Sequence, residues 1–85
     1  MKDKEQISYK ISRLKEDLLL AEKMHYTNVI KIKTHQISLL NRLKNTSTKK
    51  VRDELLLLKD EMESKDIDVI RAGASYEIYK WLLSK

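Results

Sequence analysis

The sequence predicts an all-α protein in which a long N-terminal helix is followed by two shorter helices. Two observations favour helix throughout. The chain has no Pro and a single Gly, so the usual residues of turns are missing, and apolar residues recur at spacings of three and four. Its 85 residues suit one domain with a small core. We therefore expect a single helical domain over residues 1–85, folded as an antiparallel helical hairpin or three-helix bundle and completed by self-association.

The long helix is expected over residues 4–44. Its inward stripe comprises Ile7, Ile11, Leu14, Leu18, Ala21 and His25, and continues through Val29, Ile32, Gln36, Leu40 and Leu43. On this stripe His25 is expected to be buried or at the core boundary. β-Branched residues cluster in "YTNVIKIKT" and lower helix propensity. The helix can therefore kink or break near 25–28, and the sequence leaves open whether it is continuous through 25–34.

The two shorter helices are expected over residues 48–64 and 67–83. In "NTSTKK", Ser47 or Thr48 can cap the second helix, whose inward stripe is Val51, Leu55, Leu58 and Met62. In "SKDID", the candidate caps of the third helix are Ser64, Asp66 and Asp68. One face of that helix carries Ile67, Ile70, Ala74, Ile78 and Trp81, with Trp81 expected in the core. The small residues of "RAGAS" either admit a neighbouring backbone or include a Gly that the helix tolerates at a cost of about 1 kcal/mol.

Charge is strongly polarised within a net +5. Residues 23–52 hold eight Lys and Arg and no acid, whereas residues 53–68 sum to −5. One interpretation is that the second helix runs back along residues 43–28 and pairs the two blocks internally. The alternative is an outward basic face for nucleic acid or an acidic protein partner. That face would comprise Lys31, His35, Arg42, Lys44, Lys49, Lys50 and Arg52.

Apolar residues outnumber the positions that a helical hairpin can bury. The surplus predicts a coiled-coil-like interface with a second copy, as a homodimer, or with another protein. The candidate interface residues are Tyr9, Leu20, Leu56, Leu57, Tyr76 and Tyr79. The competing interpretation is a three-helix core wide enough to cover them.

No catalytic, metal-binding or cofactor-binding pattern is evident. The chain has no Cys, its two His are ten residues apart, and one Gly cannot build a phosphate-binding loop. No apolar run resembles a signal peptide or a membrane span, so a cytoplasmic protein is expected. We expect a non-enzymatic protein–protein interaction module, such as a small regulator, inhibitor or assembly factor. The alternative is a nucleic-acid-binding protein that uses the basic block 23–52, and an enzyme with a cationic pocket ranks last.

Overall fold

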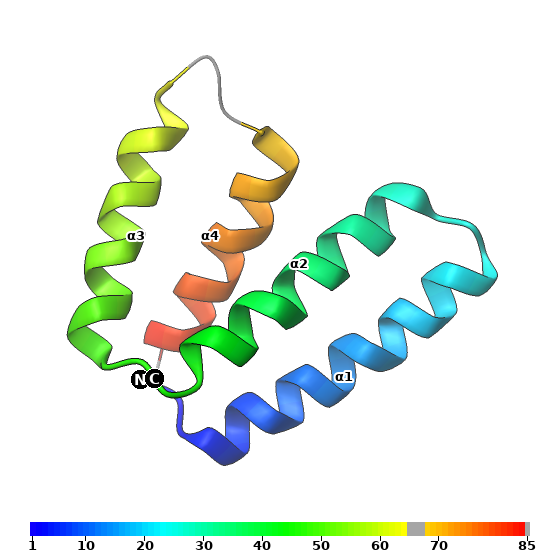
Figure 1. The fold of residues 1–85 in the computed structure, drawn as a ribbon, viewed down its shortest axis with the longest axis horizontal. Helices are drawn as coiled ribbons and strands as arrows, with labels where there is room; N and C mark the ends of the chain where they lie inside the picture. Colours follow the sequence, from blue (N-terminus) through cyan, green and yellow to red (C-terminus); the bar gives the residue numbers. More distant parts are fainter. Residues whose placement is uncertain (65–67, 85) are drawn as a thin grey trace.

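The structure, a computed structural model, describes residues 1–64 and 68–84. These residues form four helices and no strand: α1 (Lys4–Lys23), α2 (Thr27–Leu43), α3 (Thr48–Met62) and α4 (Val69–Leu83) (Figure 1). The predicted all-α class is confirmed. There are four helices rather than the expected three, because residues 4–44 divide into α1 and α2. Asp66 as a cap and the expected helix start at Ile67 lie outside the described residues.

The break between α1 and α2 is a Schellman motif built without glycine. Tyr26 donates its backbone N–H to the carbonyl of Ala21 across 3.0 Å, and His25 donates to Glu22 across 3.3 Å. This pattern requires a left-handed residue after the helix cap, and His25 has φ 57°. Histidine tolerates that region better than most residues do. His25 is therefore exposed in a turn rather than buried on the stripe, which corrects the sequence-based expectation.

The four helices form two hairpins that meet along α2 and α4. α1 packs against α2, α3 packs against α4, and α4 contacts α2 (Figure 1). The molecule is flat, with extents of 37 × 36 × 19 Å. In this arrangement α3 packs mainly on α4 and not on α2. The expectation that the acidic segment would run back along the basic α2 is therefore wrong. The termini meet where the hairpins join, since Lys2 donates its backbone N–H to the carbonyl of Leu82 across 3.0 Å.

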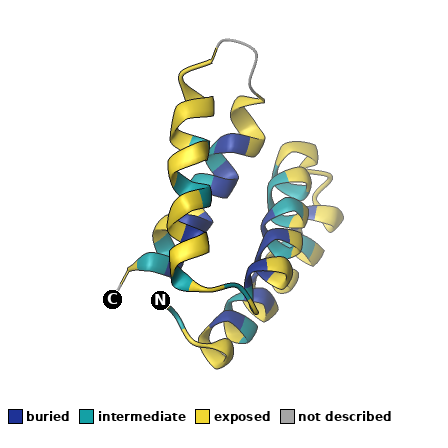
Figure 2. Cartoon of the chain, turned by 60° about the vertical axis from the view of Figure 1, so that its left-hand side comes forward, coloured by how far each residue is buried: buried dark blue, intermediate teal, exposed yellow. Residues whose placement is uncertain are grey.

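The core lies where the hairpins meet, and buried positions face inward on each helix (Figure 2). Five of the eleven residues of the predicted stripe of α1 and α2 contribute to it, whereas α3 contributes one fully buried residue. The core residues are Ile7, Ile11, Leu14, Leu39, Leu40, Leu43, Val51, Ile78, Tyr79 and Leu82. Met62 and Ile70 were expected to point inward but are 41% and 45% exposed, because both lie at the splayed end of the α3–α4 hairpin.

Side-chain caps begin three of the four helices. Ser47 accepts from the N–H of Lys50 at the start of α3, and Asp68 accepts from that of Arg71 at the start of α4. Both were candidate caps in the sequence. Asp3 forms a capping box with Gln6 at the start of α1, and α2 has no side-chain cap.

Candidate interaction surfaces

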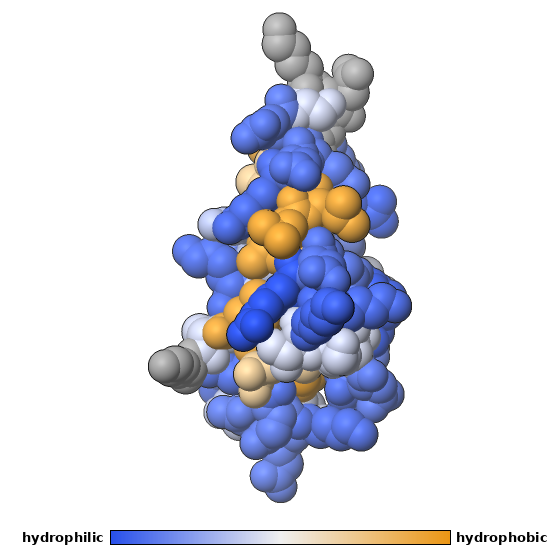
Figure 3. Space-filling view, turned by 90° about the vertical axis from the view of Figure 1, so that its left-hand side faces the viewer, coloured by the Kyte–Doolittle hydropathy of each residue, from blue (hydrophilic) through white to orange (hydrophobic). Residues whose placement is uncertain are grey.

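α3 exposes two adjacent leucines. Val51, Leu55 and Leu58 occupy the face that packs inward. Leu56 and Leu57 lie on the rest of the circumference and are 60% and 63% exposed. Figure 3 shows the side of the molecule on which α3 lies, where apolar side chains gather among hydrophilic ones. The four-helix core therefore leaves both of these candidate interface residues in contact with solvent.

The aromatic candidates divide between surface and core. Tyr9 is 67% exposed on α1, where Leu20 is 62% exposed. Tyr76 is half-buried, and the ammonium of Lys80 lies 5.4 Å from its ring centroid. Tyr79 is buried in the core, so its assignment to a partner interface was wrong: α4 lies between α2 and α3 and is covered on both sides.

The sequence analysis missed further exposed apolar residues. Leu19, Met24 and Tyr26 surround the α1–α2 turn, and each is more than half exposed. Val69, in the first turn of α4, is 76% exposed. A firm prediction of a helix break at residue 25 would have indicated that Leu19, Met24 and Tyr26 are exposed, because residues beside a turn have fewer neighbours to cover them.

Trp81 lies half-buried against the core rather than inside it. The ammonium groups of Lys2 and Lys10 lie 5.6 Å and 5.4 Å from its ring centroid. These distances are within the range of cation–π attraction. The indole therefore packs against the edge of the core, and its ring lies beneath Lys2, which precedes α1, and Lys10 of α1.

The basic candidates are mostly unpaired among the described residues. Lys33 lies 3.8 Å from Asp17, and Arg42 lies 2.8 Å from Glu54. The remaining candidates of the basic face form no ion pair within 4.0 Å in the described part of the chain: they are Lys31, Lys44, Lys49, Lys50 and Arg52. Internal pairing thus accounts for only a small part of the basic block.

Arg42, Glu54 and Tyr79 connect three helices. Arg42 of α2 binds Oε1 of Glu54 on α3, and the Tyr79 hydroxyl of α4 donates to the same oxygen across 3.5 Å. The hydrogen bond with Glu54 raises the pKa of Arg42. Burial raises the pKa of Tyr79, and the Glu54 charge adds to the effect. Oε2 of Glu54 is buried and accepts no hydrogen bond from the described residues.

His35 does not point outward as predicted but faces α4. Its Nε2 lies 2.5 Å from the Ser75 hydroxyl, and the adjacent Gln36 donates to the Ala74 carbonyl across 3.1 Å. Gln36 is 4% exposed, so the junction of the two hairpins contains a buried polar contact. Burial lowers the pKa of His35 from its ordinary value of 6.5. The positive charge of Arg71 lowers this pKa further. The negative charge of Asp68 raises it by less, so the pKa of His35 remains below 6.5.

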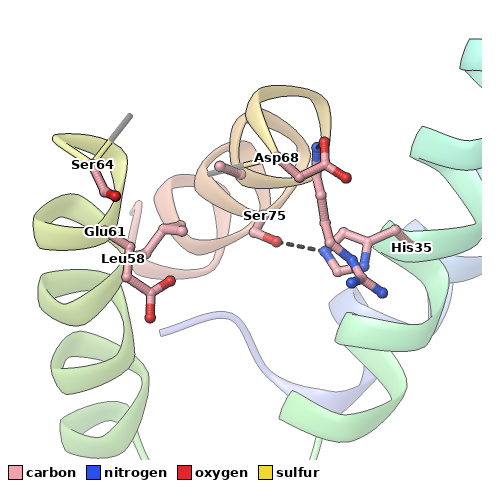
Figure 4. Close-up of a pocket in the computed structure, with 8 residues that line it drawn as sticks. His35, Leu58, Glu61, Ser64, Asp68 and Ser75 are labelled. Atoms are coloured by element: carbon pink, nitrogen blue, oxygen red, sulfur yellow. Dashed lines mark hydrogen bonds between the residues drawn. The ribbon is translucent and has the colours of Figure 1, made fainter. Parts of the chain in front are cut away.

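An open cavity of about 430 Å³ lies between α3 and α4 beside this junction (Figure 4). Leu58 and Glu61 of α3, with Ser64 just beyond the end of this helix, line it opposite Ser75 and His35. Asp68, Arg71 and Ala72 complete the lining. Cationic and anionic side chains both border the cavity, so its lining does not select one charge of ligand.

The described residues contain no group of three His, Asp or Glu that could hold a metal ion. Within the same residues no helix is both long enough and apolar enough to cross a membrane. Comparison of the chain with protein-family models, curated proteins and solved structures found no match. The fold and its surfaces define a small all-α protein of two helical hairpins, with apolar side chains exposed on α1 and α3.

Proposed function

We propose that this protein is a non-enzymatic protein–protein interaction module, acting as a small regulator, inhibitor or assembly factor. The observation that supports this most directly is the exposure of Leu56 and Leu57 on α3, at 60% and 63%. Burying a leucine on binding contributes about 1.5–3 kcal/mol. Two such residues on one helix suit a partner that offers an amphipathic helix or an apolar groove.

The charged residues around the leucines fit the same role. Arg52, Asp53, Lys59 and Asp60 are exposed one turn before or after the leucines on α3. An apolar centre with a polar rim is typical of protein interfaces, in which the rim contributes to specificity and orientation. α3 thus has both parts of a helical recognition surface.

Site-specific photo-crosslinking in cells tests this proposal. A photoreactive amino acid placed at position 57 of the full chain is expected to yield a discrete crosslinked polypeptide. Lys15 is the matched control position, because it is exposed on α1 away from Tyr9 and Leu20. Leu56→Asp, introduced into the chain that carries the crosslinker at position 57, is expected to reduce the yield while circular dichroism still reports a helical protein.

The crosslinking result can also contradict the proposal. If positions 9, 20, 56 and 57 all yield no more product than position 15, then neither exposed face binds a protein partner. The function would then have to be sought in the basic residues.

Nucleic-acid binding is the second candidate, and the unpaired cations favour it. Lys44, Lys49, Lys50 and Arg52 lie within nine residues across the α2–α3 turn, and Lys31 adds a charge on α2. None of them forms an ion pair among the described residues. Such a cluster can neutralise several phosphates of a backbone.

Fluorescence anisotropy of a short duplex and a short single strand, titrated with nuclease-treated protein at several salt concentrations, separates the two functions. A nucleic-acid binder is expected to show log K falling linearly with log salt, with a slope near 0.9 per duplex phosphate contact. The double variant Lys49→Glu/Lys50→Glu should then abolish binding, whereas Leu57→Asp should not change it. An absence of binding at low salt would eliminate this second candidate.

A further inference from the structure

Among the exposed charges of α3, basic residues predominate near the N-terminus and acidic residues near the C-terminus, with Asp53 and Lys59 of the opposite sign on either side of Leu56. Lys49, Lys50 and Arg52 lie in its N-terminal half, and Asp60 and Glu61 lie near its C-terminal end. Glu63 follows as the C-cap. These residues are exposed, and none forms an ion pair within 4.0 Å among the described residues. A helix with this distribution is complementary to a second copy of itself that runs in the opposite direction.

We propose that α3 pairs antiparallel with α3 of a second copy of this chain, about a two-fold axis at Leu56. The inference rests on the proposed function and names one partner for the same surface. Its contact stripe has helical spacing of three and four: Lys49, Arg52, Leu56, Lys59 and Glu63. Asp53 and Asp60 border this stripe.

The two-fold symmetry determines which residues meet. A residue n positions after Leu56 lies opposite the residue n positions before it. Arg52 then faces Asp60 of the second copy, Asp53 faces Lys59, and Lys49 faces Glu63. Each pair joins opposite charges and occurs twice, while the two Leu56 side chains pack together at the centre.

Other arrangements of the same helix place like charges together. An antiparallel pair centred on Leu57 would set Asp53 against Glu61 and Glu54 against Asp60. A parallel pair would set each charge against its own copy. Like charges across an interface are unfavourable. The charge pattern therefore selects Leu56 as the centre. Leu19 on α1, which is 61% exposed against 60% for Leu56, serves as a matched control.

One helix pair forms a small interface, so weak self-association is expected. Exposed ion pairs contribute about 0–1 kcal/mol each, and most of the affinity comes from burial of Leu56. Small interfaces of this kind are typical of transient complexes, which corresponds to a Kd on the order of 10–100 µM. Because the surrounding pairs are exposed, added salt is expected to weaken the dimer.

Sedimentation equilibrium of the purified full-length chain, over about 5–500 µM, tests the proposal across the Kd range expected for a small interface. The wild-type chain should form dimers. Leu56→Asp should weaken self-association at least about tenfold, and Leu19→Asp should change it by less than about threefold, because only the first places a charge at the two-fold axis.

A charge exchange gives a second, independent result. Arg52→Glu and Asp60→Arg should each weaken the dimer about three- to tenfold, and the double variant should restore it. Residues 52 and 60 are two helical turns apart in one chain, so rescue requires contact between two copies. A wild-type monomer at all concentrations would overturn the inference, as would equal effects of the two leucine variants or failure of the rescue. The crosslink from position 57 to a different protein would still support the proposed function.

Discussion

Arg42 on α2 and Glu54 on α3 form an ion pair of 2.8 Å across the short turn between the two hairpins. The Tyr79 hydroxyl of α4 donates to the same Glu54 oxygen. One carboxylate therefore joins three helices that otherwise diverge from this end of the molecule (Figure 1). Among the described residues, the Arg42–Glu54 pair is the one ion pair within 4.0 Å that joins the basic block 23–52 to the acidic segment 53–68.

Glu54→Ala is expected to destabilise the fold by about 1–2 kcal/mol, because it removes a charge-assisted hydrogen bond and the acceptor of Tyr79. Urea unfolding followed by circular dichroism measures the change at about 2 µM protein, where weak self-association is negligible. Asp53→Ala is the control, since Asp53 is exposed on the same helix. Equal losses for the two variants would contradict a structural role for Glu54.

Gly73→Ala is expected to stabilise the fold by about 0.5–1 kcal/mol, because alanine favours helix and reduces the entropy of the unfolded chain. Gly73 lies within α4, and a Cβ there would meet no atom within 4 Å. Gly73 itself is therefore not a point of close approach, and the tolerated-glycine interpretation applies at this position. The midpoint of thermal unfolding should rise. A fall would show that the added methyl group meets a neighbour.

His25→Gly is expected to stabilise the fold by about 0.5–1 kcal/mol, because glycine adopts the left-handed conformation of residue 25 without steric cost. His25→Val should destabilise it, since a β-branched residue is strained at positive φ. Urea denaturation of both variants gives the order of stability. Valine as stable as glycine would be incompatible with a Schellman turn at this position.

The free energy of unfolding is expected to fall as the pH drops below about 6.5, because the folded state lowers the pKa of His35. The unfolded chain then binds the proton first, and stability is lost until the pH passes below the folded-state pKa. Stability from this source is complete above 6.5. Chemical denaturation between pH 7.5 and 5 measures the slope.

Variants at the junction identify the cause of that slope. His35→Gln should flatten it, and Arg71→Gln should reduce it, because Arg71 is a charge that disfavours protonation of His35. Ser75→Ala should lower stability at every pH but keep the slope, since a protonated ring can still donate to the Ser75 hydroxyl. An unchanged slope in His35→Gln would mean that other groups carry the pH dependence.

Local signals in the sequence were sufficient for several elements. Ser47 and Asp68 were identified as caps because capping involves a side chain and a backbone N–H three residues away. The stripe from Ile7 to Leu14 and the residues Gln36, Leu40 and Leu43 were assigned to the interior from helical spacing alone, and they are buried. Leu56 and Leu57 were likewise recognised as surplus to the inward face of α3.

The sequence by itself determined the helical class, the turn at residues 44–47 and most inward faces, because these depend on neighbours within one or two turns. The tertiary structure decided the rest. A continuous stripe through residue 25 fits one long helix or a folded hairpin equally well, and packing of α1 on α2 favours the hairpin. Because α4 packs against both α2 and α3, His35 of α2 contacts Ser75 of α4 and Tyr79 is buried. Contacts between residues about 40 positions apart are not encoded in local periodicity, since they arise only from which helices bury their apolar faces together.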